Sequence, residues 1–266
     1  MNNPVLQKEL FMRLRLRQFP LATRISLLGI GMILLGVIYY FMIKKWIIED
    51  PSSHSGYDAW CVTVGIQAAL ICLIAPAVAA NSITQEKEQQ TWEMLIFTRL
   101  LPGEIIFGKL MARTALLALM LLMFVPIELF CWIKSSALIS VTMLLLTYLT
   151  LFIAAIFYAT FGLYMSWLLN RTIYAIMSAY SFVIGGLVVG TFLITSMLDM
   201  VLSEDMYTKC PLMWVNPVMM MYESMSPKEN SNTILFLIYG LVVYLVLTML
   251  ILWRMTVGFR RFAYSR

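Results

Sequence analysis

The sequence has few charged side chains and little of the material that most enzymes use for catalysis. Only 12% of its 266 residues are charged, and it has a single histidine and four cysteines. A soluble domain of this length usually carries about twice that share of charge. His54 alone offers little for a Ser-His-Asp triad or a zinc site. There is too little polar surface to cover a globule in water, so lipid must be the solvent for most of the chain.

The cysteines show no metal-binding pattern, because no two of them stand at the spacing of metal ligands. We interpret all four as small apolar residues in or near membrane spans. Three of them fall near one expected membrane face, and the sequence does not decide whether two of these three form a disulfide. These three are Cys61, Cys131 and Cys210, and the fourth is Cys72.

A complete nucleotide-binding motif is also lacking. Residues 103–109, GEIIFGK, match the first seven positions of a phosphate-binding P-loop. The eighth position needs a Ser or Thr hydroxyl to hold magnesium, and here it is Leu110. No strand pattern precedes this stretch. We therefore expect no ATP site in this chain.

The sequence is instead rich in long apolar runs, with 61% hydrophobic residues and a mean hydropathy of +0.85. Six runs are long enough to cross about 30 Å of hydrocarbon. We expect an all-α membrane protein with about six transmembrane helices in a single transmembrane domain, residues 1–266. The runs cover approximately residues 25–43, 59–80, 110–133, 138–169, 173–197 and 233–253.

Two of these runs have unusual features. The fourth is longer than one crossing needs, so it must tilt, bend near Gly162 or project into the cytoplasm. It follows the third after only Lys134–Ala137, which predicts a tight helical hairpin. The first run is followed at once by lysines and lacks a small-residue cleavage site, so we expect a retained span rather than a signal peptide.

The distribution of basic residues predicts the orientation. Most of the 19 Lys and Arg residues fall on one set of loops, which the positive-inside rule assigns to the cytoplasm. Both termini are then cytoplasmic, residues 198–232 form an outer loop and residues 254–266 a basic cytoplasmic tail. Basic residues gather at the edges of apolar runs rather than among aromatics, so we expect no nucleic-acid partner. The few basic residues outside are Lys44, Lys45, Lys134, Lys209 and Lys228.

Residues 1–24 carry leucines and arginines at helical spacing. This pattern predicts an amphipathic helix on the inner membrane surface, with its arginines toward lipid phosphate. The alternative is a short basic tail that only sets orientation. The residues that form the pattern are Leu6, Leu10, Arg13, Leu14 and Arg17.

The cytoplasmic segment of residues 81–109 mixes charges with large apolar residues. Thr91 can cap a short helix that continues through Trp92 and Leu95, and Pro102 with Gly103 would end it. An exposed Trp and Leu flanked by acids suit a docking element for a soluble partner, because an aromatic anchor fills a pocket while charges fix the register. The alternative is an interfacial helix whose Trp92 sits among lipid headgroups.

Glu128 is the exceptional acid, since it lies within the third run, two residues after Pro126. Proline there is expected to kink the helix. An ionisable residue inside a span is by default a functional candidate, so Glu128 is a candidate for a translocation path. The alternative is an interfacial carboxylate that reaches water near Lys134, roughly 9 Å along the axis.

Two stretches of the sequence carry a resemblance to a known family. They are the opening NPVLQKEL with its basic tail and the stretch SITQEKEQQTWEMLIFTRLLPGEIIFGKL. The first resembles the cytoplasmic start of type-2 ABC exporter permeases, and the second is similar to their signature between spans two and three. The six-span layout extends the resemblance over essentially the whole chain. One departure is that proline comes at Pro102 rather than directly after Thr98. The matching positions are Glu86, Thr91, Trp92, Glu93, Leu95, Thr98, Pro102, Gly108 and Lys109.

This resemblance implies a permease subunit that is not itself an enzyme and binds no cofactor. Two permease halves, either identical copies or paralogues, would form a dimer in the lipid bilayer. Each would dock on a separate ABC ATPase subunit that holds ATP and magnesium, with residues 81–109 as the coupling helix. A compact permease without a fused ATPase suggests the cytoplasmic (inner) membrane of a bacterium.

Two other classes of function remain open. One is a membrane scaffold or force-transmitting subunit of an ABC-like complex that moves no solute. The other is an intramembrane enzyme, which would need paired polar residues at matching depth in facing spans, where only Glu128 offers itself. The Leu-, Met-, Ile- and Phe-rich spans favour a hydrophobic or amphipathic cargo, if the chain transports one.

Overall fold

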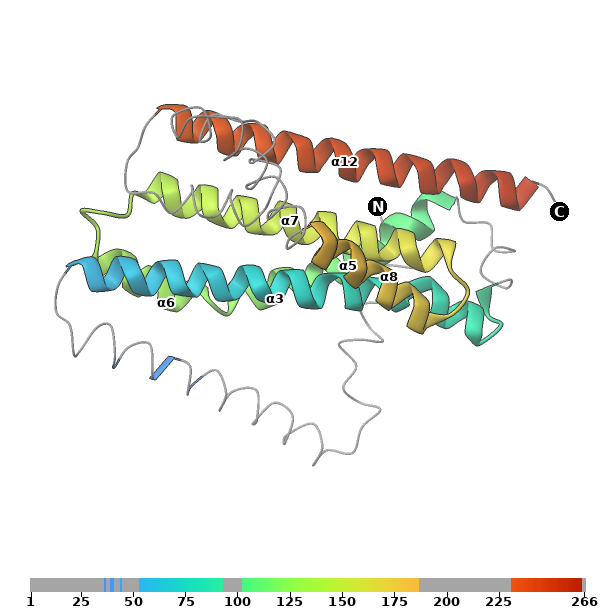
Figure 1. Cartoon of the computed structure of the whole chain (residues 1–266), viewed down its shortest axis with the longest axis horizontal. Helices are drawn as coiled ribbons and strands as arrows, with labels where there is room; N and C mark the ends of the chain where they lie inside the picture. Colours follow the sequence, from blue (N-terminus) through green and yellow to red (C-terminus); the bar gives the residue numbers. More distant parts are fainter. Residues whose placement is uncertain are drawn as a thin grey trace, which may run out of the picture.

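The computed structural model describes residues 53–92, 102–186 and 231–264, with Gly36, Tyr39, Tyr40 and Lys44 as isolated positions. These ranges are almost entirely helical and contain no strand (Figure 1). The helices are α3 (Ser53–Glu88), α5 (Pro102–Leu122), α6 (Val125–Lys134), α7 (Val141–Leu168), α8 (Thr172–Ile184) and α12 (Ser231–Tyr264).

Four helical segments are long and apolar enough to cross a membrane. They are Gly56–Glu88, Gly103–Lys134, Val141–Leu168 and Ile238–Phe259. Each contains or closely overlaps one expected run, at residues 59–80, 110–133, 138–169 and 233–253. The chain is therefore an all-helical protein with the character of a multi-pass membrane protein.

The remaining expected elements are described only in part or not at all. The fifth run, 173–197, begins as the shorter apolar helix α8 and leaves the described range after Gly186. The first run, 25–43, has three described positions. The N-terminal pattern of Leu6, Leu10, Arg13, Leu14 and Arg17 lies outside the described residues, as does nearly all of the outer loop 198–232.

Helix α7 lies between α3 and α12 and is the most buried of the four long segments (Figure 1). Small residues on α7, including Ala155, Ala159 and Gly162, let its neighbours approach closely. Close approach by small residues is how helices associate in lipid, where the hydrophobic effect contributes little between them. The small residues of α7 therefore place it at the centre of the bundle.

The closest contact between α3 and α7 occurs at Gly162. A Cβ atom at this position would lie 2.6 Å from the carbonyl oxygen of Pro76 and 3.1 Å from the Cβ of Ala79. Helix α7 continues without interruption past this point to Leu168. Gly162 allows α7 to pass close to α3.

The break expected at Pro126 is present. Helix α5 ends at Leu122 and α6 begins at Val125, with proline in its first turn. Because proline has no amide hydrogen, the carbonyl of Leu122 loses its usual helical donor. At the same break the hydroxyl of Tyr39 donates a hydrogen bond to the carbonyl of Met123.

The connection between α6 and α7 is the expected tight hairpin, and it spans residues 135–140. The amides of Leu138 and Ile139 both donate to the carbonyl of Ser135 at 2.9 Å. Ser140 then caps α7 by accepting a hydrogen bond from the amide of Met143 at 3.2 Å. These local bonds satisfy the backbone at a turn that faces away from the polar end of α3.

The cysteines described are Cys61, Cys72 and Cys131, and all three are free thiols. Cys61 and Cys131 are therefore not joined to each other. Cys210 lies outside the described residues.

Substitution of Gly162 by alanine is predicted to destabilise the protein by about 2 kcal/mol, because the new methyl group meets backbone atoms of α3 that cannot rotate away. The matched control is Gly65→Ala in α3, where nothing lies within 4 Å of the added atom. That change should be neutral or stabilising, since alanine is the better helix former. Melting temperatures in detergent check the pair, and equal effects of the two substitutions would contradict this packing.

Candidate functional site

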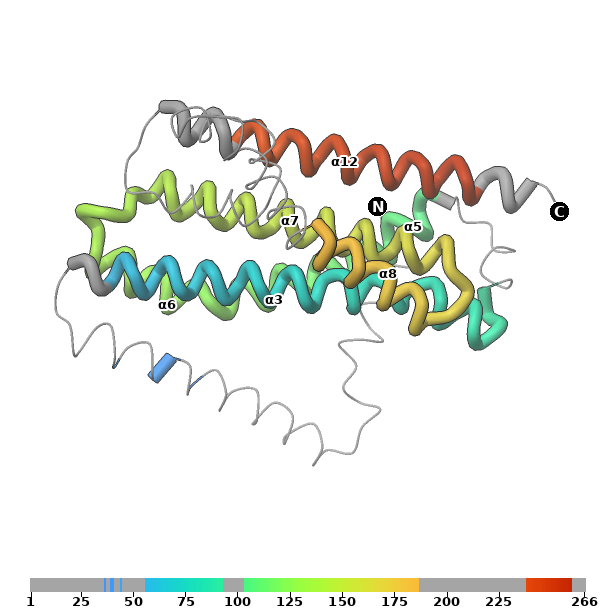
Figure 2. Tube along the Cα trace, viewed as in Figure 1, coloured from blue at the N-terminus to red at the C-terminus, as the bar shows by residue number. Residues whose placement is uncertain are grey.

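Five helix ends converge at one end of the bundle. The C-terminal ends of α3, α7 and α12 meet the N-terminal ends of α5 and α8 there (Figure 2). The described parts of the segment of residues 81–109 lie at this end: residues 81–88 form the last turns of α3, and residues 102–109 form the first turns of α5. Helix α3 has 36 residues, which is about 54 Å of helix, so its polar end can extend several turns beyond a 30 Å hydrocarbon core.

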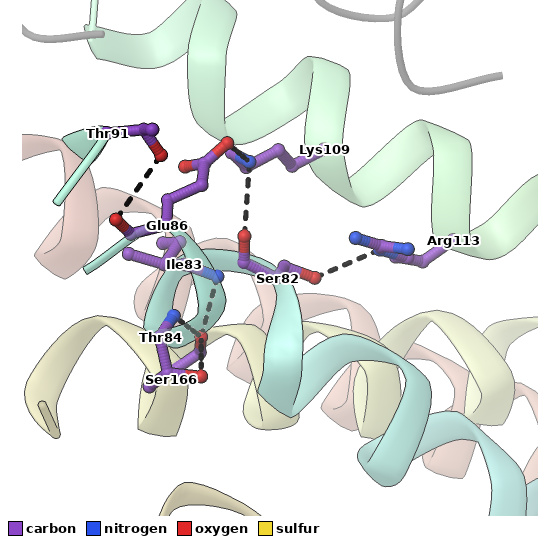
Figure 3. Close-up of polar contacts among 8 residues, drawn as sticks. All are labelled: Ser82, Ile83, Thr84, Glu86, Thr91, Lys109, Arg113 and Ser166. Carbon is purple, nitrogen blue, oxygen red and sulfur yellow. Dashed lines mark hydrogen bonds and ion pairs between the residues drawn. The ribbon is translucent and has the colours of Figure 1, made fainter. Parts of the chain in front are cut away.

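An ion pair joins the part of this segment that lies in α3 to the part that lies in α5. The Nζ of Lys109 on α5 lies 2.7 Å from Oε1 of Glu86 on α3, and it also donates to the carbonyl of Ser82 at 3.1 Å (Figure 3). Lys109 is only 1% exposed, whereas Glu86 is 24% exposed. The structure thus brings together two of the predicted site residues, Glu86 and Lys109. We call this ion pair, which joins α3 to α5 at the two ends of the segment, the clamp.

The next turn of α5 extends this clamp. Nε of Arg113 donates to the Ser82 hydroxyl at 2.9 Å, and the arginine is buried (Figure 3). Residues four apart lie on the same face of a helix, so Ser82 and Glu86 on α3 face Lys109 and Arg113 on α5. The sequence analysis missed Ser82 and Arg113. The sequence did contain a signal for them, because Ser82 stands four residues before Glu86 and Arg113 stands four residues after Lys109.

A serine of α7 binds the same turn of α3 from the opposite side. The Ser166 hydroxyl oxygen accepts hydrogen bonds from the amides of Ile83 and Thr84, at 2.8 and 2.9 Å (Figure 3). Ser166 follows Gly162 by one turn, so it lies on the face of α7 that approaches α3 most closely. The polar end of α3 is therefore held between α5 and α7.

Two adjacent residues of α3 cap the neighbouring helices. Nζ of Lys87 donates to the carbonyl of Leu169 at 2.9 Å and also to that of Trp167, at the C-terminus of α7. Oε1 of Glu88 accepts from the amide of Thr172 at 2.8 Å, at the N-terminus of α8. A cation at a helix C-terminus and an anion at an N-terminus are both favourable for the helix dipole. Lys87 and Glu88 thereby fix the connection between α7 and α8.

Helix α3 ends in a Schellman turn. The amide of Thr91 donates to the carbonyl of Glu86 at 2.9 Å, the amide of Gln90 donates to that of Lys87 at 3.2 Å, and Gln90 has a φ of 57°. The Thr91 hydroxyl also donates to the Glu86 carbonyl, at 3.3 Å (Figure 3). The side chain of Thr91 is thus used to close the preceding helix.

Trp92 is buried, in contrast to the exposed anchor that we expected. It is 8% exposed, and its ring packs edge-on against Phe259 of α12 with centroids 5.3 Å apart. An edge-to-face aromatic pair contributes about 1 kcal/mol beyond the area it buries. Sequence reasoning missed Phe259, because nothing local links a residue of the C-terminal helix to residue 92. Trp92 joins the start of the segment to α12.

The other predicted residues of the segment fall in two groups. Pro102 is the first residue of α5, and Gly108 is buried one residue before Lys109. Helix α5 thus begins well before the expected start of the span at residue 110. Glu93, Leu95 and Thr98 lie outside the described residues.

Glu128 lies at the opposite half of the bundle, in α6. It is 1% exposed, so it does not reach water as the alternative interpretation required. The Nε2 of Gln67, on α3, donates a hydrogen bond to Oε1 of Glu128. The Tyr148 side chain from α7 lies beside the same carboxyl group. Sequence reasoning missed Gln67 and Tyr148, which reach Glu128 only through the packing of three helices.

These two polar groups differ in what they can do. At the end of α3, one ion pair and two helix caps connect α3 to α5, α7 and α8, and the Trp92–Phe259 ring contact adds α12, which suits mechanical coupling. The Glu128 group has a buried carboxyl and suits proton or ligand binding. In the part of the chain that the structure describes, no group of three or more His, Cys, Asp or Glu side chains could hold a metal ion.

No protein-family model matches the sequence, and no curated protein matches it at a significant level. The fold supports the class of multi-pass helical membrane proteins.

Glu86→Gln is predicted to destabilise the protein more than Lys109→Met does. The first change removes the carboxylate that lies 2.7 Å from a fully buried ammonium, at a cost of about 3 kcal/mol. The second leaves a carboxylate that is partly exposed to water, at about 1–2 kcal/mol. The double variant should recover part of the loss. Thermal unfolding in detergent checks the order, and the reverse order would rule out this asymmetry.

Gln90→Gly is predicted to stabilise the end of α3 by about 1 kcal/mol, since glycine adopts a positive φ without the steric cost of a Cβ atom. Gln89→Gly, one residue earlier and without a positive φ, should lower stability. Comparing the melting temperatures of the two variants tests the turn. A loss of stability in Gln90→Gly would show that the left-handed conformation is not adopted.

Proposed function

We propose that this chain is the membrane-spanning permease subunit of an ABC-type exporter. It would cross the inner membrane of a bacterium six times, with both termini in the cytoplasm. A second permease, identical or paralogous, would complete the translocation path. A separate ABC ATPase would dock on residues 81–109 and supply ATP and magnesium, so this chain would hydrolyse nothing itself.

The observation that carries the proposal is the clamp at the base of the 81–109 segment. The Glu86–Lys109 ion pair makes α3 and α5 respond together to a push on the segment. The caps from Lys87 and Glu88 pass that displacement to α7 and α8. Rigid movement of packed helices is how small shifts at one site become large conformational changes. A coupling element needs such connections.

The charges at this end support its assignment to the cytoplasm. Lys87, Lys109, Arg113, Arg171 and Arg254 all belong to the convergent helix ends, whereas Lys134 lies at the opposite end, beside Gly56. Basic residues favour the cytoplasmic side of a membrane. The segment and the C-terminal end of α12 would then face the ATPase together.

Purification of the full-length tagged chain in mild detergent, with mass spectrometry of the bound proteins, tests the proposal. An ABC ATPase should be recovered with the wild type and with the control Asp58→Ala, an exposed residue near the opposite end of α3 and outside the docking segment. Glu93→Ala with Leu95→Ala should lower recovery by about tenfold or more, as loss of interface hot spots does. Trp92 is unsuited to this test, because its substitution would also disturb α12.

Two outcomes would count against the proposal. Recovery of no ATP-binding protein with the wild type would overturn the permease assignment. Recovery of an ATPase, but with no ATP-dependent flux of any amphipathic cargo in vesicles that contain the complex, would favour a force-transmitting subunit. The second outcome would keep the docking segment and discard the transport role.

A further inference from the structure

We propose that Glu128 is a proton-binding site in the bundle interior, where its neutral carboxylic acid forms a doubly hydrogen-bonded pair with the side-chain amide of Gln67. This inference goes beyond the proposed function and does not depend on a docked ATPase. It rests on the burial of both groups, on the hydrogen bond between them and on two buried oxygen atoms, one from each group, that have no hydrogen-bond partner.

The first observation is complete burial without a counter-charge. Gln67 is 0% exposed and Glu128 is 1% exposed. Glu128 forms no ion pair with any residue in the described ranges, and Lys134, on the same helix, is about 9 Å further along the axis. An isolated carboxylate in an apolar interior is very costly, so such a group takes up a proton instead.

The second observation is the pattern of unsatisfied atoms. Gln67 Nε2 donates to Oε1 of Glu128, which leaves Oε2 of Glu128 and Oε1 of Gln67 buried without hydrogen-bond partners. Both leftover atoms are acceptors if the carboxyl is ionised. A protonated carboxyl has one O–H donor. With the proton on Oε2, this O–H can donate to Oε1 of Gln67, and a single proton satisfies both atoms.

The other titratable groups near the carboxyl bring no positive charge that would hold it ionised. Tyr148 faces both Glu128 and Gln67 from α7, and its hydroxyl carries no positive charge. Tyr39 faces Glu128 from the first run but donates to the carbonyl of Met123. Cys131 is the nearest titratable group on α6 itself, and its thiol forms no disulfide. None of these groups supplies a positive charge.

The consequence is a link between protonation and the contact of α6 with α3. The neutral pair joins the two helices through two hydrogen bonds. Loss of the proton would remove one bond and leave a charge in the apolar interior, which favours separation of the helices or entry of water. A proton bound here therefore stabilises the closed arrangement of this half of the bundle.

Infrared spectroscopy of the full-length chain in lipid at neutral pH tests the proposal. The wild-type spectrum minus that of Glu128→Gln should show the C=O stretch of one protonated carboxylic acid, which shifts in D₂O. The same subtraction with Asp58→Asn, an exposed acid on α3, should show only carboxylate bands. If the Glu128 difference also shows only carboxylate bands, the proposal is wrong.

Stability supplies a second test that does not depend on spectral assignment. Glu128→Gln can replace the acid–amide pair by an amide–amide pair, so its melting temperature should stay close to that of the wild type at neutral pH. Gln67→Met keeps a similar volume but removes both hydrogen bonds, and it should lower the melting temperature clearly. A large loss in Glu128→Gln together with a small loss in Gln67→Met would overturn the paired neutral acid.

Discussion

The close approach of α3 and α7 at Gly162 is the constraint on which the other contacts depend. Because a Cβ atom would collide with the backbone of Pro76, only glycine lets the two helices come this near. One turn further along α7, the same proximity allows the Ser166 hydroxyl to reach the amides of Ile83 and Thr84. Lys87 then reaches the last carbonyls of α7. A wider spacing of these helices would lose all of these bonds at once.

In an apolar bundle each polar contact carries more weight than it would at a water-exposed surface, since an unpaired polar group finds no water. Helix α3 supplies both polar groups of the described bundle, Ser82 and Glu86 near one end and Gln67 toward the other. Each group fixes α3 to the same neighbouring span, which α5 and α6 form together. Helix α3 is therefore positioned to connect events at the segment of residues 81–109 with events around Glu128.

Four of the expected spans and the interruption at Pro126 were predictable from sequence because local properties determine them. Hydropathy and length sufficed for the four long apolar helices, and the missing amide of Pro126 sufficed for the break between α5 and α6. The burial of Trp92 was not predictable, because it depends on Phe259, which is 167 positions away. The pairing of Gln67 with Glu128 likewise requires the packing of helices 61 residues apart in the sequence.

The proposed coupling requires the Glu86–Lys109 pair to hold α3 and α5 together at the base of the segment. Spin labels on Gln85 of α3 and Phe107 of α5, both exposed, would measure this directly in lipid, with the native cysteines replaced by alanine. We expect a single narrow distance distribution that broadens when Glu86→Gln is introduced. Equally broad distributions with and without that substitution would show that the ion pair does not hold the two helices together.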